Sequence, residues 1–126
     1  MPDQSAQRDP QGKGRLIMTV AKLMELASLT PITVSDPDRE VEGAYVGDLL
    51  SWVMGRASES NAWITIMSNV NVIAVASLVD VSCVILAEGV KLDAGVEKTA
   101  EAKCINILST DKSAYEIAKK LASLAV

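Results

Sequence analysis

The sequence predicts a single α/β domain in which a mixed, mostly parallel sheet of about five strands has helices on both faces. The main evidence is a pattern that occurs three times in the second half: an apolar run, a short polar loop, then a helix-like stretch. The runs are residues 62–67, 81–86 and 105–108. Strands buried on both faces read as continuous apolar runs, and helical crossovers join parallel strands. Ligands of such sheets bind beyond the carboxyl ends of the strands, so the pattern also predicts where a site lies.

The first ordered element is predicted to be a helix over residues 19–29. Its apolar side chains recur at i, i+3, i+4 and i+7, Thr19 is in position to cap it, and Pro31 is expected to end it. Residues 1–15 are rich in Gln, Asp, Gly and Pro, which cannot build a core, so we expect a disordered tail before a domain over 16–126. The tail also lacks the apolar segment of a signal peptide.

Two strands, residues 32–35 and 41–46, flank an Asp-Pro-Asp-Arg turn, and this arrangement favours a hairpin or a similar reversal. The helix predicted next, over 48–56, begins with Asp48 near the positive end of the helix dipole. Apolar residues surround much of this helix. A helix that is apolar on every side must be covered on every side.

Helices are predicted to follow each strand of the second half, over residues 70–79, over 94–103, and from 113 to about 124. Asn69 and Asp93 are in position to cap the first two. Ser113 and Glu116 have the spacing of a capping box at the start of the last helix, with Asp111 as the alternative cap. The first of these helices is rich in Val and Ile, so a strand is the competing assignment there.

The composition argues against several classes of function. The net charge is −4, and the only basic cluster is Lys119-Lys120, whereas a nucleic-acid surface is strongly basic. The chain has no His and 3% aromatic residues, so it lacks the commonest general acid–base group, imidazole metal sites and platforms for stacking bases. No apolar stretch is long enough to span a membrane. We therefore expect no enzymatic activity, no metal, no cofactor, no nucleic-acid partner and no membrane insertion.

The two cysteines, Cys83 and Cys104, belong to no C-x-x-C motif and lie in or next to apolar runs. The simplest interpretation is two small buried side chains; a disulfide and a reactive thiol are the alternatives. Two cysteines without a disulfide framework, in a chain without a signal peptide, indicate a cytoplasmic location.

On the last predicted helix, Tyr115 is assigned to the buried stripe.

Three segments carry a resemblance to a known family: residues 41–54 (VEGAYVGDLLSWVM), 62–67 (AWITIM) and 81–89 (VSCVILAEG). Over residues 18–124 the chain resembles the DRTGG domain family, whose members are similar to the N-terminal domain of HPr kinase/phosphorylase. These domains occur in phosphotransacetylases, between CBS domains of some pyrophosphatases, and as free-standing proteins often encoded near iron hydrogenase components. The resemblance implies a non-catalytic regulatory or assembly module, linked to hydrogenase or energy metabolism. A small-ligand sensing domain, for an adenine nucleotide or another anion, is the alternative.

The motif that names the family is altered at both strand ends where it would occur. Ser68-Asn69-Val70 replaces a Gly-Asp-Arg-like turn, and Ala87-Glu88-Gly89 replaces Thr-Gly-Gly after the next strand. Our candidate ligand-binding residues at this edge of the sheet are Gly47, Asp48, Ser68, Asn69, Glu88 and Gly89. Backbone N–H groups and helix N-termini there can hold an anion, together with Ser109, Thr110 and Asp111. The alternative is that such residues only cap helices, and Glu88 and Asp111 would repel a phosphate.

Large side chains are rare in this chain, so Trp52, Met54 and Trp63 are informative. One role is core packing; the other is contact with a partner, because Trp and Met are enriched at the centres of interfaces. The apolar circumference of the helix over 48–56 favours the second role for Trp52 and Met54. We therefore predict that these two residues form an interface, with a homodimer as the expected assembly, and leave open whether the further partner is a protein or a small ligand.

Overall fold

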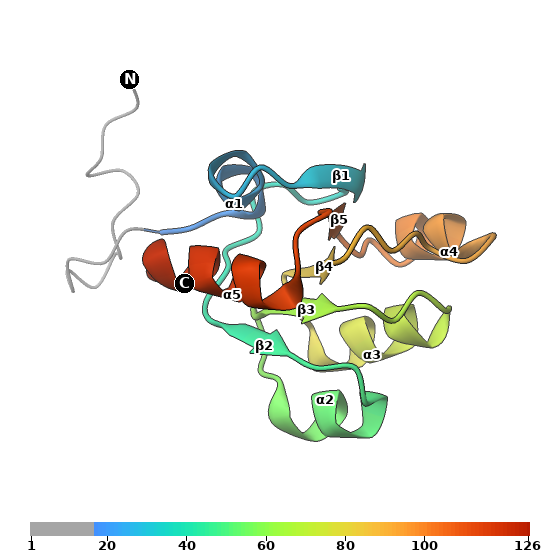
Figure 1. Ribbon diagram of the computed structural model, residues 1–126. Helices are drawn as coiled ribbons and strands as arrows, with labels where there is room; N and C mark the ends of the chain where they lie inside the picture. Colours follow the sequence, from blue (N-terminus) through green and yellow to red (C-terminus); the bar gives the residue numbers. More distant parts are fainter. Residues whose placement is uncertain (1–16) are drawn as a thin grey trace.

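The computed structural model describes residues 17–126, which form a five-stranded sheet between two layers of helices (Figure 1). The strands are β1 (Thr30–Thr33), β2 (Ala44–Val46), β3 (Ala62–Thr65), β4 (Cys83–Leu86) and β5 (Ile107–Ser109). The helices are α1 (Val20–Leu26), α2 (Leu50–Arg56), α3 (Asn71–Val79), α4 (Val96–Ala102) and α5 (Ala114–Ser123). The predicted disordered tail, residues 1–15, lies outside the described part of the chain.

The sheet has the strand order β1-β5-β4-β3-β2. Every neighbouring pair of strands is parallel except β1 with β5, which is antiparallel. The prediction of a single α/β domain with a mixed, mostly parallel sheet of five strands is therefore confirmed, as is the parallel arrangement of the last three strands.

Each central strand sends alternate side chains into two separate cores, because neighbouring residues of a strand point to opposite faces. Ala62 and Ile64 of β3 join the core under α1 and α5, whereas Trp63 between them joins the core under α2, α3 and α4. All residues of β3 and β4 are buried. Burial on both faces is the reason that these strands have continuous apolar sequences.

The predicted hairpin between the first two strands is wrong, because β1 and β2 lie at opposite edges of the sheet (Figure 1). Residues 34–43 run instead along the amino-terminal ends of the central strands. Side chains that precede β5, β4 and β3 bind this segment: Asn106 binds Asp36, Ser82 binds Glu40, and Asn61 binds Glu42. These contacts carry the segment from one edge of the sheet to the other.

Two helix boundaries in the first half differ from the prediction. Helix α1 ends at Leu26, so Pro31 does not end it; Pro31 lies within β1, where an edge strand tolerates the missing N–H group. Helix α2 begins at Leu50, and no side chain caps it. Asp48 therefore does not open this helix, and its contacts belong to the sheet edge described below.

The helix caps agree in part with the prediction. Thr19 Oγ1 accepts from Lys22 N at 3.2 Å, and Ser113 and Glu116 form the predicted capping box. The segment over Asn71–Val79 is a helix and not the competing strand. The prediction that Asp93 caps α4 is wrong, because α4 begins only after Gly95, which has a φ of +83°.

Three predictions of burial are wrong. Cys104 is exposed, in the turn that follows α4, where its φ is +57°. Tyr115 is 74% exposed, because Ile117 and Leu121 form the buried stripe of α5. Helix α2 is not covered on all sides, and Val53 is its one buried residue. Within residues 17–126, no helix has the length and hydropathy needed to cross a membrane.

Candidate ligand-binding site

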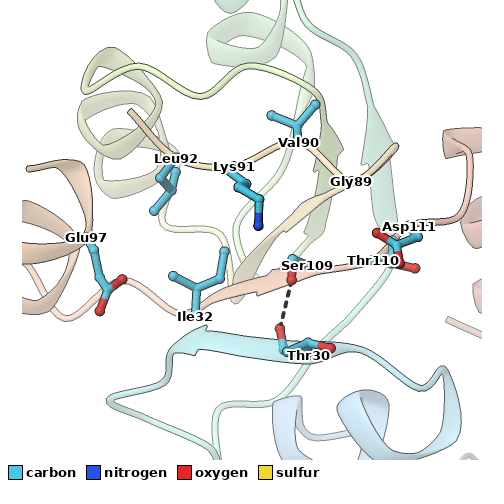
Figure 2. Close-up of a pocket in the computed structure, with 10 residues that line it drawn as sticks. All are labelled: Thr30, Ile32, Gly89, Val90, Lys91, Leu92, Glu97, Ser109, Thr110 and Asp111. Carbon is cyan, nitrogen blue, oxygen red and sulfur yellow. Dashed lines mark hydrogen bonds between the residues drawn. The ribbon is translucent and has the colours of Figure 1, made fainter. Parts of the chain in front are cut away.

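The carboxyl ends of the parallel strands meet at one edge of the sheet, as the sequence predicts. Because β1 is antiparallel to β5, its amino end comes to this same edge. Ser109 Oγ, at the end of β5, donates to the carbonyl oxygen of Thr30 over 3.4 Å (Figure 2). The edge is therefore surrounded by the loops after four strands and by the start of a fifth.

A cavity of about 330 Å³ opens at this edge, over β5 and its neighbours. Its lining residues are Thr30, Ile32, Gly89, Val90, Lys91, Leu92, Glu97, Ser109, Thr110 and Asp111. Figure 2 shows the loop after β4 passing over the ends of β5 and β1, with the side chain of Lys91 pointing into the space between them. The volume lies near the small end of the range of about 300–1,000 Å³ that is typical of ligand sites.

Backbone hydrogen bonds hold the loop after β4 against the loop after β5. Glu88 N donates to Lys112 O at 2.8 Å, and Gly89 N donates to Thr110 O at 2.9 Å. Glu88 and Gly89 have left-handed φ angles of +61° and +69°, which glycine adopts without strain. A Cβ atom on residue 89 would lie 3.1 Å from Asp111 Oδ1. Gly89 therefore permits the close approach of the two loops that forms one wall of the cavity.

Three charged side chains line the cavity: Lys91 in the loop after β4, Glu97 in the first turn of α4, and Asp111 after β5. In Figure 2, Glu97 and Asp111 lie on opposite sides of Lys91. Across the described residues, none of these three side chains takes part in a hydrogen bond or an ion pair. All three are solvent-exposed, so their charges are available to a ligand.

Two of the predicted site residues, Gly47 and Asp48, follow β2 and form hydrogen bonds with β3 and the residue after it. Asp48 Oδ1 accepts from Thr65 Oγ1 at 2.7 Å and from Ile66 N at 2.9 Å. Gly47 O accepts from the indole Nε1 of Trp63 at 2.9 Å. Since Thr65 and Trp63 are buried, two of these bonds satisfy side-chain polar groups that water does not reach.

Ser68 and Asn69, also predicted as site residues, stabilise the turn between β3 and α3. Ser68 Oγ donates to Asp93 Oδ1 at 2.8 Å, and Asp93 N donates back to Ser68 O at 3.0 Å. Asn69 Oδ1 accepts from Asn71 N at 2.9 Å, at the start of α3. Ser68 thus connects this turn with the loop that leads into α4, whereas Asn69 stabilises the turn itself.

Of the six candidate residues, the structure brings Gly89 into the lining of the cavity. Ser109, Thr110 and Asp111, which were expected at the same edge, also line it. The other five candidates lie along the edge outside the cavity, and their role in ligand binding stays a prediction.

Sequence reasoning missed six lining residues, among them the apolar Val90 and Leu92 in the loop after β4. Thr30 and Ile32 were missed because the pairing of β1 with β5 was not foreseen. Lys91 and Glu97 belong to no motif, and their only sequence signal is that they closely follow Gly89.

Comparison with known proteins agrees with this architecture. The sequence profile of the DRTGG domain matches residues 33–124. The chain belongs to the DRTGG domain family. No curated protein sequence matches the chain.

A solved structure with the same fold as this DRTGG domain contains the CBS and DRTGG domains of the regulatory region of Clostridium perfringens pyrophosphatase, complexed with its activator, diadenosine tetraphosphate. The TM-score is 0.66, with 12% sequence identity. The match covers 82% of this chain and 46% of the other, so the chain spans less than half of that regulatory region.

Helix α2 of this DRTGG domain exposes the two residues predicted to form an interface. Trp52 is 53% exposed and Met54 is 47% exposed. The guanidinium carbon of Arg56 lies 3.9 Å from the centre of the Trp52 ring, which is a cation–π contact on the outer surface. Core packing is thus the role of Trp63 but not of Trp52. The interface role of Trp52 and Met54 stays a prediction.

The described residues offer little for metal or thiol chemistry. Residues 17–126 contain no group of three or more His, Cys, Asp or Glu side chains placed to hold a metal ion. Burial raises the pKa of Cys83 to about 12, an effect that the nearby Arg39 charge reduces in part. The Cys83 thiol therefore stays protonated at neutral pH and is a poor nucleophile. Cys104 is a free, exposed thiol and does not line the cavity.

Proposed function

We propose that this DRTGG domain is a non-catalytic regulatory module that binds a small ligand in the cavity at the carboxyl edge of its sheet. The observation that carries the proposal is the cavity itself, which lies where parallel sheets usually bind ligands. The similar fold within a regulatory region of a pyrophosphatase supports a regulatory role.

The cavity is suited to transmit binding, because its walls belong to separate parts of the fold. Residues 89–92 follow β4, Glu97 belongs to α4, and Thr30 and Ile32 belong to the edge strand β1. A ligand that contacts all three would link α4 and the sheet edge through its own bonds. Ligand binding would then restrict the relative movement of these segments, which a partner protein could sense.

The ligand carries at least one anionic group, because Lys91 extends an unpaired ammonium into the cavity (Figure 2). This agrees with the expected sensing of an adenine nucleotide or another anion. Thermal unfolding tests the proposal with a panel of nucleotides, acyl phosphates and anionic metabolites, including amino acids. A ligand at about 100 times its Kd stabilises the fold by about 2.7 kcal/mol, and raises Tm by roughly 10 °C.

The matched variants are Lys91→Met, which removes the positive charge from the cavity, and Lys98→Met, which removes a positive charge from α4 outside it. We expect Lys91→Met to abolish the Tm shift and Lys98→Met to retain it. If no member of the panel shifts Tm, the cavity is not a ligand site and the proposal fails.

A second candidate function, self-association through α2, is favoured by the exposure of Trp52 and Met54. Sedimentation equilibrium tests it: we expect a mass of twice the 13.4 kDa of one chain, and a monomer for the double variant Trp52→Ser, Met54→Ser. Leu78→Ser is the matched control, because Leu78 is 71% exposed on α3. A wild-type protein that is monomeric at all concentrations would exclude this function.

We further propose that the module acts in the cytoplasm in connection with hydrogenase or energy metabolism, as the family resemblance implies. The exposed thiol of Cys104 fits a reducing compartment. Affinity purification from native cells tests the connection, with hydrogenase subunits as the expected co-purifying proteins. If other proteins co-purify with the domain but hydrogenase subunits do not, the proposed connection is contradicted.

A further inference from the structure

We infer that the cavity selects a small zwitterion with an aliphatic side chain, such as an aliphatic α-amino acid, over a nucleotide. This inference rests on the proposed ligand site and specifies the chemical class of its ligand. It depends on three properties of the cavity: the arrangement of its charges, the absence of aromatic rings from its lining, and its size.

The charges in the cavity suit a ligand that carries both signs. Lys91 contributes one positive charge, whereas Glu97 and Asp111 contribute two negative charges on either side of it (Figure 2). A polyphosphate placed against Lys91 would share the cavity with both carboxylates, and like charges repel. A zwitterion places its carboxylate on Lys91 and its ammonium on a carboxylate of the protein. Every charge in the cavity then gains a partner of opposite sign, except one carboxylate that remains in contact with water.

The remaining lining suits an aliphatic group and not a base. Ile32, Val90 and Leu92 contribute apolar surface to the cavity, and no aromatic side chain lines it. Recognition of a base usually uses an aromatic ring on which the base stacks. The volume of about 330 Å³ is at the small end of the range for ligand sites. A branched aliphatic side chain of a few carbon atoms fits both the apolar residues and the available space.

The hydroxyl-bearing residues at the rim complete the polar contacts of such a ligand. Thr30 and Ser109 lie side by side where β1 meets β5, joined by the hydrogen bond from Ser109 Oγ to Thr30 O (Figure 2). The Thr30 hydroxyl can donate to a carboxylate, whereas Ser109 Oγ, whose proton goes to Thr30 O, can accept from an ammonium group. These groups therefore favour a charged head group at the β1–β5 end of the cavity, near Lys91.

Calorimetric titration of the wild-type protein with three matched probes tests the inference. L-Leucine carries both charges, isoamylamine lacks the carboxylate, and 4-methylpentanoate lacks the ammonium group. L-Valine and L-isoleucine extend the first class, and AMP and ATP represent nucleotides. We expect the amino acids to bind at least about tenfold more tightly than either single-charge analogue, which equals about 1.4 kcal/mol, and the nucleotides to bind more weakly still.

The variants identify the groups that recognise each charge. Lys91→Met is expected to weaken binding of the amino acid at least about tenfold, and to leave the amine analogue unaffected. Glu97→Gln or Asp111→Asn is expected to weaken the amino acid and not 4-methylpentanoate. Lys98→Met and Glu101→Gln, on α4 but outside the cavity lining, serve as controls and should bind like the wild type. Because all five side chains are exposed, circular dichroism should show an unchanged fold.

The outcomes separate this inference from the proposed function. If a nucleotide or 4-methylpentanoate binds as tightly as the amino acids, and Lys91→Met abolishes that binding, the cavity is a ligand site but not a zwitterion site, and the inference fails alone. If no probe of any class binds, the proposed function fails as well. Amide chemical-shift changes at residues 89–92 on addition of L-leucine would place the amino acid in the cavity, whereas changes confined to another surface would overturn the inference.

Discussion

The side-chain amide of Asn106 binds the backbone of Asp36 through both its oxygen and its nitrogen. Asp36 N donates to Asn106 Oδ1 at 3.0 Å, and Asn106 Nδ2 donates to Asp36 O at 2.9 Å. The same Nδ2 donates to Ser82 O at 3.0 Å. Asn106 is 4% exposed, so this one side chain satisfies three backbone groups at the amino edge of the sheet and joins residues far apart in sequence.

The first prediction concerns this contact. Asn106→Ala should lower the free energy of unfolding by about 2–3 kcal/mol, because it leaves partly buried backbone groups without hydrogen bonds. Urea denaturation followed by circular dichroism measures the change. Asn71→Ala is the control: its side chain is exposed at the start of α3, and the change should be within about 0.5 kcal/mol. Equal effects of the two variants would contradict the structural role of Asn106.

The contact also explains why the pairing of the first strand was not predictable from the sequence. The apolar runs identify β3, β4 and β5 as buried strands, and buried strands joined by helices are parallel. The partner of β1 depends instead on polar contacts such as that of Asn106 with residue 36, which is distant in sequence. A single Asn in a sequence carries no sign of its partner, whereas the Asp-Pro-Asp-Arg turn favours a hairpin.

The site was predictable to the extent that it depends on parallel strands. Gly89, Ser109 and Thr110 lie within three residues of the ends of predicted strands, so their position at one edge followed from the fold class. Thr30 lies there because of an antiparallel pairing, and Lys91 and Glu97 because of the path of one loop. Charged residues in loops are common on every protein surface, so sequence alone does not distinguish those that line a cavity.

The second prediction compares two glycines. Gly89→Ala should destabilise the fold by about 1–2 kcal/mol, because residue 89 has a φ of +69° and a new Cβ would lie 3.1 Å from Asp111 Oδ1. Gly55→Ala should stabilise it by about 0.5–1 kcal/mol, because Gly55 lies in helix α2 with nothing within 4 Å of its added Cβ. Thermal and urea unfolding of both variants measure the difference. A stabilising Gly89→Ala would show that the loop does not need the left-handed conformation.

The third prediction tests the link between β2 and β3. Asp48→Ala removes the acceptor of Thr65 Oγ1 and of Ile66 N, and Thr65 is 1% exposed. We expect a loss of about 1–3 kcal/mol, because a buried hydroxyl is left without an acceptor. Asp48→Asn keeps a side-chain oxygen that can accept both bonds, so its effect should be clearly smaller. If both variants unfold at the wild-type urea concentration, the Asp48 bonds contribute nothing to stability.

The fourth prediction concerns the reactivity of the two thiols. Cys104 is exposed and Cys83 is buried, and the pKa of Cys83 is raised to about 12. In the native protein near neutral pH, one equivalent of Ellman's reagent should therefore react quickly, and Cys104→Ser should remove that reaction. The second equivalent should appear only on unfolding. Rapid reaction of the Cys104→Ser variant would mean that Cys83 is accessible.

The fifth prediction follows from the same pKa through its effect on stability. An unfolded cysteine ionises at a pKa of about 8.5, whereas folded Cys83 keeps its proton until the pH approaches about 12. Between these two values the unfolded chain has lost the proton that the folded chain retains, so ionisation favours unfolding and stability falls as pH rises. Below a pH of about 8.5 both states hold the proton, and Cys83 adds no pH dependence.

The measurement is the free energy of unfolding in urea at about pH 7 and at about pH 10, for the wild type and for Cys83→Ala, both in a Cys104→Ser background. All other titratable groups are common to both proteins, so the difference between the two pH profiles isolates Cys83. We expect stability to fall more steeply with pH in the protein that retains Cys83, by up to about 1.4 kcal/mol for each pH unit above the unfolded pKa. Parallel pH profiles would mean that the thiol of Cys83 ionises as easily in the folded chain as in the unfolded one.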